Sequence, residues 1–519
     1  MEGDTAGDCQ AEAERGTAVT TNLLALLPED VLADILRRLA PRGLAASRCV
    51  CKAWRDAIDA RRLLRTELLP LSPGGIFINF HNYYISEFFS RPSTSRPSIS
   101  GKHDYLPDAG TRSWSKVLDH CNGLLLVVAY DVLDRRLEYV LNPATRFCAP
   151  LPPCPPPLVE MNSSSEKYLV YDPTISPHYE VFSITSFWYN NNRLPEDPVV
   201  EQSEWPPSIY VIHVFSSRTG CWEQRSYVRE GEAAGTIADM RHSPGDQRNA
   251  VYWRGALYVH CQSDFVMRIS LANNKYQVIK PPKGIELQHF PQFHLGKSEK
   301  GVYCASIHGR CRIRVWILDQ SPYKMEWVLK HNNNLIEWLL KNKLENVRHC
   351  PGRKVIGPWI LDDVNYYYGK HMQDDDDDAE TTVQERLKWS LEASEGVKFA
   401  FDTDNDDKVY YNSDDSIVGE ETGCSSSEGL LDEKLVWSFD CKDDILNGKW
   451  YSGYIEVLGF HPYKEIVFLS ESITRGLAYH LKSSKVQIMG NLYPARYHQE
   501  LGNEQLIRSS FLYTPSWLK

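Results

Sequence analysis

The sequence has 519 residues, and single hydrophobic cores stop growing at about 250–300 residues, so at least two domains are expected. Hydrophobic residues make up 42% and aromatic residues 11% of the chain, which excludes a wholly disordered protein. The longest near-continuous apolar run, Leu124 to Tyr130, is too short to cross a bilayer. The net charge of −11 comes without a basic stripe, which disfavours nucleic acid and membranes as partners and favours a protein.

Most of the negative charge lies in one segment, residues 373–433. This segment contains 20 acidic and 4 basic residues, so the rest of the chain carries a net charge of +5. Five adjacent aspartates, Asp374 to Asp378, repel one another, and little apolar periodicity surrounds them. We therefore expect an acidic insertion that forms a solvated loop, with recognition of a basic partner as the alternative.

The 13 cysteines are odd in number and contain no Cys-x-x-Cys pair, which predicts buried thiols and no disulfide or zinc framework. Residues 1–22 lack an apolar signal segment, so we expect a disordered N-terminus and a location in the cytoplasm and/or nucleus. Gly296-Lys297-Ser298 imitates the end of a phosphate loop, but Pro291 replaces the required glycine, which favours a turn between strands. No motif of a nucleophile elbow or metalloprotease occurs, so the sequence predicts no metal, no cofactor and no catalytic residue.

The composition of the chain changes near residue 75. Of the 59 aromatic residues, only Trp54 precedes Gly75. The part before this boundary has helical spacing, because the apolar residues of its first segment recur at i, i+3, i+4 and i+7, at Leu32, Ile35, Leu36 and Leu39. A second helix is expected over residues 44–58. A helical unit of this size buries little surface. Its apolar stripe therefore either docks on a partner or caps the larger domain.

Two runs in this helical unit carry a resemblance to a known family. The run LPEDVLADILRRL at residues 27–39, followed by SRCVCKAWR at residues 47–55, resembles an F-box. The resemblance implies that residues 23–66 form a three-helix motif that binds a Skp-type adaptor and, through it, the cullin of a ubiquitin ligase. By matching position, the adaptor-binding residues are Leu27, Pro28, Val31, Leu32, Ile35, Leu36, Val50 and Trp54. Some of these residues must form the internal core, and the sequence does not apportion them.

The remainder, residues 67–519, is rich in β-forming runs that turn residues interrupt, such as residues 123–129, 137–141, 209–215 and 250–259. An aromatic residue follows a turn at Phe147, Trp222, Tyr276 and Trp327, at spacings of 75, 54 and 51 residues. Periods near 50 residues are typical of four-stranded propeller blades. We therefore expect a large all-β, propeller-like domain of six to eight blades that contains the acidic insertion. A pair of β-sandwiches without closure is the alternative.

Three further runs extend the resemblance beyond the helical unit. CNGLLL at residues 121–126, YVLNPATR at residues 139–146 and GFHPY at residues 459–463 resemble a group of plant F-box proteins. In that group the second domain is kelch-like or otherwise propeller-like and recruits the protein to be ubiquitinated. The glycine doublet of kelch repeats occurs here only at Gly74-Gly75, so the blade number and the mode of target binding stay open.

Large aromatic residues next to polar loop residues are typical of interface anchors. Trp188 and Tyr189 precede the run Asn190 to Arg193, and Trp205 precedes two prolines, so these three aromatics are predicted to bind the target protein. The alternative is that they seal gaps between blades.

Together these patterns predict a non-catalytic substrate-recognition subunit of a Skp-cullin-F-box ubiquitin ligase. The adaptor binds the F-box, and an unknown target protein binds loops on one open face of the propeller. Two alternatives remain. The first is a propeller enzyme or small-ligand binder that is tethered to the ligase for turnover, and the second is a scaffold that binds the adaptor but degrades nothing.

Overall fold

The structure is a computed structural model of the chain. It describes the following residues: 28–39, 43–44, 47–48, 50–61, 63, 73–92, 99–107, 114–130, 135–157, 163–173, 175–187, 198–241, 249–283, 285, 293–298, 300–321, 324–342, 357–365, 445–446, 449–495, 497 and 506–516. The acidic insertion, the N-terminal residues 1–22 and three predicted site residues, Leu27, Trp188 and Tyr189, lie outside this described part.

The N-terminal helical unit contains helix α1 (Glu29–Arg37) and helix α3 (Lys52–Ala60). Its small core is made by Leu32, Leu36, Leu44, Ala57 and Ile58, with Trp54 and Leu63 packed against it. The prediction of one continuous helix over residues 44–58 is wrong, because Cys51 has an extended backbone with φ −159° and ψ 168° and α3 begins at the next residue. Val50 and Cys51 have low helix propensities, which favours this interruption. The third helix of the predicted F-box stays a prediction.

The β region consists of antiparallel sheets, each of four strands, and one sheet of eight strands. In order across each four-stranded sheet, the strands are β21 (Ile360–Asp362), β2 (Glu87–Ser90), β1 (Gly75–Phe80) and β28 (Ile507–Tyr513); β3 (Trp114–Cys121), β4 (Leu124–Tyr130), β5 (Arg136–Asn142) and β6 (Phe147–Leu151); β17 (Phe293–Ser298), β18 (Gly301–His308), β19 (Arg312–Ser321) and β20 (Lys324–Asn334); and β24 (Ile455–Phe460), β25 (Ile466–Glu471), β26 (Arg475–His480) and β27 (Lys485–Asn491).

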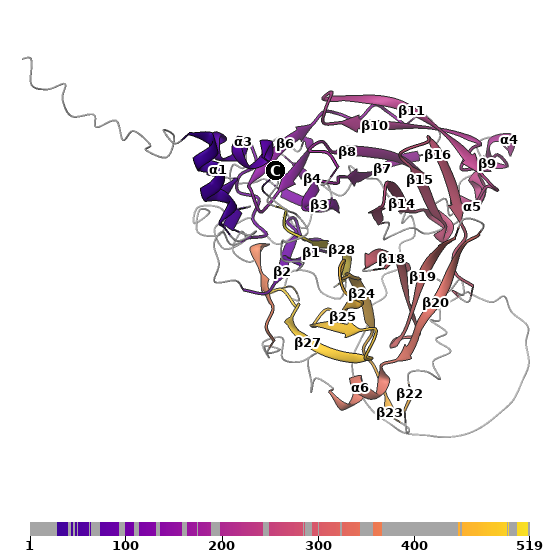
Figure 1. Cartoon of the computed structure of the whole chain (residues 1–519). Coiled ribbons are helices and arrows are strands. Elements are labelled where there is room, and N and C mark those ends of the chain that lie inside the picture. The colour runs from indigo at the N-terminus through magenta and orange to yellow at the C-terminus, as the bar shows by residue number, and fades with distance from the viewer. Residues whose placement is uncertain are drawn as a thin grey trace, which may run out of the picture.

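The eight-stranded sheet consists of two four-stranded antiparallel halves. The first half contains β7 (Ser163–Val170), β8 (Glu180–Phe187), β10 (Ile209–Ser216) and β11 (Cys221–Glu230), and the second contains β13 (Ala250–Trp253), β14 (Ala256–His260), β15 (Val266–Ser270) and β16 (Lys275–Ile279). The halves join where β11 pairs in parallel with β16, for example Val228 opposite Lys275. The sheet therefore turns back on itself, and its two edge strands, β7 and β13, both lie toward the centre of the molecule (Figure 1).

Short elements connect these sheets. They are the strand pairs β9 (Glu204–Trp205) with β12 (Gly235–Thr236) and β22 (Ile445–Leu446) with β23 (Lys449–Trp450), the helices α4 (Pro198–Glu201), α5 (Ile237–Arg241) and α6 (Ile336–Lys341), and the 3-10 turn η3 (Gln262–Asp264). No helix within the described ranges is both long enough and apolar enough to span a membrane.

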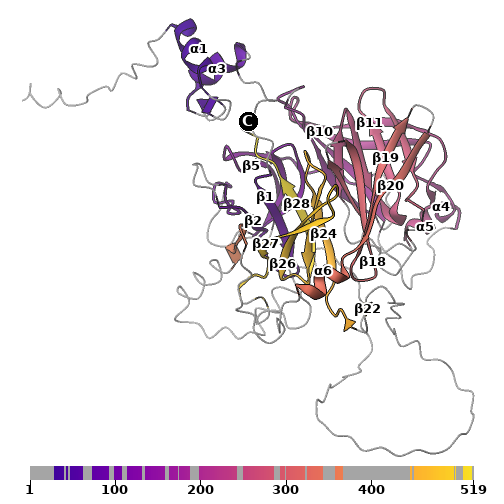
Figure 2. The ribbon, with the colours of Figure 1, turned by 60° about the horizontal axis from the view of Figure 1, so that its bottom comes forward.

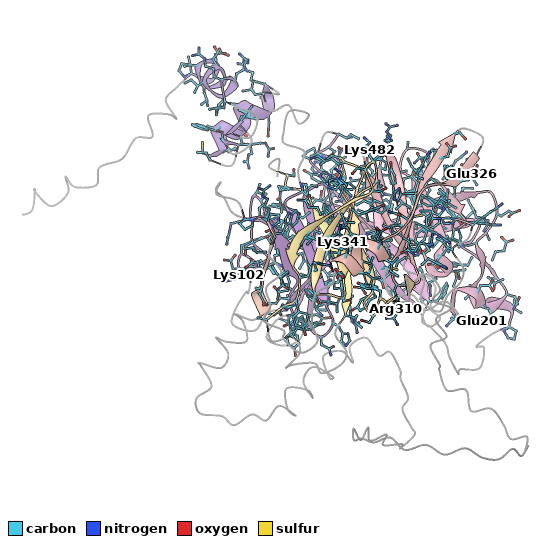
Figure 3. The ribbon with its side chains drawn as sticks, turned by 90° about the horizontal axis from the view of Figure 1, so that it is seen from below. Lys102, Glu201, Arg310, Glu326, Lys341 and Lys482 are labelled. Atoms are coloured by element: carbon cyan, nitrogen blue, oxygen red, sulfur yellow. The ribbon has the colours of Figure 1, made fainter. Side chains whose placement is uncertain are left out.

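The sheets are arranged around a common centre (Figure 1). One edge strand of each four-stranded unit lies innermost: β28, β3, β7, β13, β17 and β24. Contacts link β28 with β3, β3 with β7, β13 with β17, β17 with β24, and β24 with β28. Side chains fill the space between the sheets (Figure 3). The predicted helical unit followed by a large all-β region is thus confirmed.

The two ends of the β region meet in one sheet. Strand β28, close to the C-terminus, pairs antiparallel with β1, so that Gly75 lies opposite Tyr513 and Phe77 opposite Phe511. The ring of Tyr513 stands edge-on to that of Phe77, with 5.7 Å between the centroids. This antiparallel pairing gives backbone hydrogen-bond partners to both β1 and β28. Without it, each strand would have an unpaired edge at one end of the β region.

The apolar runs in the sequence reflect how the sheets cover one another. Strand β4, with the sequence LLLVVAY, is buried at every residue except Tyr130, because neighbouring sheets cover both of its faces. Strand β11, at the outer side, is buried only at Tyr227. The predicted run 250–259 is a hairpin, since Arg254 and Gly255 both have positive φ, 45° and 75°, as a two-residue turn requires.

We expect the contact between β28 and its neighbouring sheet to be essential for stability. Phe511 is buried in a cluster with Phe77, Leu125 and Leu141, which come from two different sheets. Phe511→Ala should lower the free energy of unfolding by about 3–5 kcal/mol, because a cavity opens between the sheets. Urea denaturation checks this value, with Ile209→Ala as the control because Ile209 is 61% exposed. Equal losses in both variants would contradict the importance assigned to the β1–β28 closure.

We also expect one inner-strand carboxyl group to make stability depend on pH. Burial raises the pKa of Glu456 on β24 from the ordinary 4.5 to about 7, and among the described residues its Oε2 has no hydrogen-bond partner. The folded state therefore keeps a proton that the unfolded chain releases, and it loses stability as the pH rises from about 4.5 to 7. The variant Glu456→Gln has nearly the same shape but no titrating group, so its stability should not fall with pH in this way.

The measurement is urea unfolding at several pH values. The stability of the wild type relative to Glu456→Gln should fall by about 2–3 kcal/mol across this window. Glu232→Gln is the control, because the side chain of Glu232 is 85% exposed. Parallel pH curves for the wild type and Glu456→Gln would show that Glu456 does not titrate in this way.

Candidate functional site

Helix α1 has two apolar faces. Its inner face carries Leu32 and Leu36, which are 4% and 0% exposed, and its outer face carries Val31 and Ile35, which are 44% and 46% exposed; Leu39, two residues beyond the end of α1, is 39% exposed. Residues four apart lie above one another on a helix, so Val31 and Ile35 share one face of α1, and Leu39 follows after the helix has ended. The structure therefore divides the predicted stripe into a core half and a surface half.

The remaining predicted adaptor-binding residues fall on both sides of this division. Pro28 is exposed at the start of α1, and Val50 is 64% exposed in the segment before α3. Trp54 is half-buried and packs against the helical core. The outer apolar face is defined here as Pro28, Val31, Ile35, Leu39 and Val50. Leu39 was absent from the predicted set, although its position four residues after Ile35 was a signal for it.

Polar contacts fix α1 and α3 around this face. Arg48 makes a two-pronged ion pair with Asp59, with Nε to Oδ1 at 2.7 Å and Nη2 to Oδ2 at 2.8 Å. Arg61 at the end of α3 pairs with Asp30 in α1. Exposed pairs of this kind contribute up to about 1 kcal/mol each, and the planar geometry of arginine adds orientation. Figure 2 shows α1 and α3 beyond one end of the sheets, and the residues of the outer apolar face are exposed to solvent.

The predicted target-binding residue Trp205 lies in the core of the β region. Its side chain is 6% exposed, and its ring stands edge-on to Phe187 at 4.7 Å and to Tyr210 at 5.4 Å between centroids. This corrects the expectation of a surface anchor, because neighbouring aromatic rings cover the indole. The burial agrees with the alternative, in which the aromatic side chain fills space between strands.

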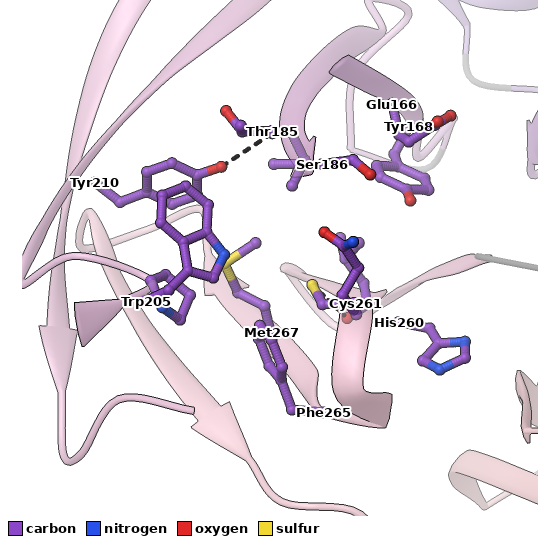
Figure 4. Close-up of a pocket in the computed structure, with 14 residues that line it drawn as sticks. Glu166, Tyr168, Thr185, Ser186, Trp205, Tyr210, His260, Cys261, Phe265 and Met267 are labelled. Atoms are coloured by element: carbon purple, nitrogen blue, oxygen red, sulfur yellow. Dashed lines mark hydrogen bonds between the residues drawn. The ribbon is translucent and has the colours of Figure 1, made fainter. Parts of the chain in front are cut away.

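Trp205 also lines a pocket between the two halves of the eight-stranded sheet (Figure 4). Polar groups of the pocket are used within the fold: the amide N–H of Thr185 donates to the Tyr210 hydroxyl at 3.0 Å, and Gln262 Nε2 donates to the carbonyls of Phe187 at 2.8 Å and Met240 at 3.0 Å. These bonds occupy the side chains of Tyr210 and Gln262 within the fold, whereas Nδ1 of His260, another lining residue, has no hydrogen-bond partner in the described part of the chain. The described residues contain no cluster of three or more side chains that could hold a metal.

We predict that Trp205 contributes to stability. Trp205→Ala should lower the free energy of unfolding by about 3–5 kcal/mol, because it removes a buried ring from an aromatic cluster. Thermal unfolding of the full chain is the measurement. Glu204→Ala, at the exposed neighbouring position, is the matched control. An unchanged melting temperature for Trp205→Ala would restore the interpretation of Trp205 as an anchor.

Comparison with known proteins shows a family match for the helical unit. The family model described as the F-box domain matches residues 24–66, which include all of α1 and α3. A protein of Arabidopsis thaliana named as F-box protein At3g16210 is 27% identical over 258 residues, covering 49% of this chain and 61% of that protein. A second, named as F-box protein At1g46840, is 22% identical and covers 59% of each chain. The matches thus span about three-fifths of these relatives. The predicted resemblance to plant F-box proteins is confirmed.

Solved structures resemble the chain only distantly. Hsv2p of Kluyveromyces lactis is 10% identical with a TM-score of 0.26, covering 52% of this chain and 75% of that one. A similarity at this level carries no conclusion about the β region. Its kelch-like character stays a prediction.

Proposed function

We propose that this F-box protein is the substrate-recognition subunit of a Skp-cullin-F-box ubiquitin ligase. Its F-box domain at residues 24–66 binds a Skp-type adaptor, and its β region captures a target protein. The observation that carries this proposal is the outer apolar face, since Val31, Ile35 and Leu39 stay exposed while the small core of the helical unit covers only the opposite face of α1. A line of exposed apolar side chains on a small module favours a docking surface.

The β region fits a propeller of six blades. Its four separate four-stranded sheets and the two halves of its eight-stranded sheet give six units, each with one strand at the centre. The pairing of β1 with β28 closes the ring with strands from both ends of the region, which supports a closed propeller over two open sandwiches.

In this proposal the chain positions its target and leaves the chemistry to other subunits. Binding a target beside the ligase raises the effective concentration of the two reactants, which requires a recognition surface and no catalytic group. The loops between blades are the favoured surface, because the strands use their side chains to pack the sheets. Trp188 and Tyr189 stay candidates for target contacts, and a cytoplasmic or nuclear location is part of the proposal.

The outer apolar face makes a sharp test possible. Replacing Val31 and Ile35 together with Ala should weaken adaptor binding roughly thirtyfold, by about 2 kcal/mol, because apolar contacts at an interface centre are lost. The change should leave the melting temperature nearly unaffected, since both side chains are exposed. Affinity of the full chain for a purified Skp-type adaptor is the measurement.

Two further variants of the helical unit serve as controls. Arg38→Ala, also exposed, should keep wild-type affinity. Leu36→Ala should destabilise the helical unit, because Leu36 is fully buried in its core. If the folded Val31/Ile35 variant binds the adaptor as well as Arg38→Ala does, the adaptor uses a different face. If the wild type binds no adaptor and no cullin copurifies, the proposed function is wrong.

A further inference from the structure

Basic side chains gather at the centre of the ring of sheets. Lys297 and His294 lie on the inner strand β17, and His120 lies on the inner strand β3. The sequence favoured a turn at Gly296-Lys297-Ser298, but these residues end β17. The correction matters because it places Lys297 on an innermost strand.

The side chain of Lys297 joins three sheets. Its Nζ donates to Oδ1 of Asn122 at 2.8 Å and lies 3.5 Å from the carbonyl oxygen of Tyr252. Asn122 follows β3, Tyr252 belongs to β13, and neither strand is in the sheet of β17. The amide of Asn122 is itself held, because its Nδ2 donates to the carbonyl of Tyr171 at 2.6 Å. The ammonium group is therefore fixed at the centre of the molecule.

This ammonium group lacks a full counter-charge. Among the ion pairs of the described residues, none joins Lys297 to a carboxylate, and burial lowers its pKa although Cys121 and Asp172 partly oppose that shift. An amide oxygen and a peptide carbonyl offset the charge of a buried ammonium only in part. A bound anion would supply the missing partner.

His120 adds hydrogen-bond capacity near this charge, and His294 lies near His120. Burial, and then nearby Lys297 and His294, lower the pKa of His120 to about 3. Burial also lowers the pKa of His294 to about 4. Both rings are thus neutral near pH 7, and each offers one N–H donor. The Nδ1 of His120 is buried without a hydrogen-bond partner in the described part of the chain. Such atoms are rare in folded proteins, and a bound water or ion is one way in which they are satisfied.

The rest of the inner surface carries groups of both signs, and Glu456 on the inner strand β24 is one of the acidic groups. Burial, and then nearby Arg508, lowers the pKa of Lys116 on β3 to about 8, so further basic groups lie along the inner strands. The carboxyl of Asp119 accepts the amide N–H of Leu169 at 2.6 Å and is occupied within the sheets. Next to His294, Gly459 leaves space, since a Cβ there would lie 3.8 Å from Nε2, and its φ of 143° disfavours other residues.

We propose that the centre of the ring binds a small oxyanion of phosphate size, held by Lys297, His120 and His294. One ammonium and two imidazole donors suit a tetrahedral group with several acceptor oxygens. The anion is either free phosphate or the phosphate group of a small molecule, since both present the same chemistry. This inference goes beyond the proposed adaptor and target binding and does not depend on it.

Calorimetric titration of the full chain with inorganic phosphate, at constant ionic strength, tests the proposal. The wild type should bind one equivalent saturably and should melt at a higher temperature with phosphate than with chloride or acetate. Lys297→Met should weaken phosphate binding roughly ten- to a hundredfold, because a charge-assisted hydrogen bond is lost. Lys300→Met is the control, since Lys300 makes an exposed ion pair with Glu465 at 3.0 Å and should bind as the wild type does.

A second variant keeps the test valid if Lys297→Met does not fold. His120→Gln keeps a polar side chain and should also bind phosphate at least about tenfold more weakly. Free phosphate and a larger phosphate compound are distinguished by adding glycerol phosphate, which should bind more tightly only if the ring accommodates an organic group. Absence of saturable phosphate binding by the folded wild type overturns the proposal, as does equal binding by the wild type, Lys297→Met and His120→Gln.

Discussion

The pairing of β28 with β1 is the constraint on which the rest of the β region depends. These strands lie more than 400 positions apart in the sequence, at residues 75–80 and 507–513, yet they form one ladder. Closing so long a loop costs conformational entropy, which the buried contacts of Phe77, Phe511 and Tyr513 offset. Because β28 contacts β3 on one side and β24 on the other, this pairing ties the inner strands of neighbouring sheets together.

The helical unit follows a different constraint, which is its size. With five residues in its core, it can bury only one face of α1. The opposite face therefore stays apolar and exposed, and the free energy of covering it becomes available for binding. The β region is large enough to bury its apolar surface, since strands such as β4 are covered on both faces. The chain thus combines a module that needs a partner to cover its surface with a body that covers its own.

Local patterns in the sequence predicted the elements well, and contacts between distant residues were beyond them. The run 209–215 is strand β10 within one residue, because β-branched and aromatic residues there are continuous. The prediction of a helix over residues 44–58 was wrong, because Cys51 has an extended backbone, which hydrophobic periodicity does not reveal. Helical spacing placed Leu32 and Ile35 on one stripe, but only the position of α3 separates the buried from the exposed residue. The contact of Lys297 with Asn122 joins residues 175 positions apart, so no local pattern could predict it.

The parallel pairing of β11 with β16 has a consequence for the solubility of the protein. An outermost strand exposes unpaired backbone N–H and C=O groups, which invite the edge strands of other molecules. Over residues 228–230 and 275–277, β11 and β16 pair with each other and satisfy some of these groups within one chain. Elsewhere the long strand β20, at residues 324–334, stands at the end of its sheet. Protection against edge-to-edge aggregation is therefore uneven around the ring, and it is greatest where two units share their outer strands.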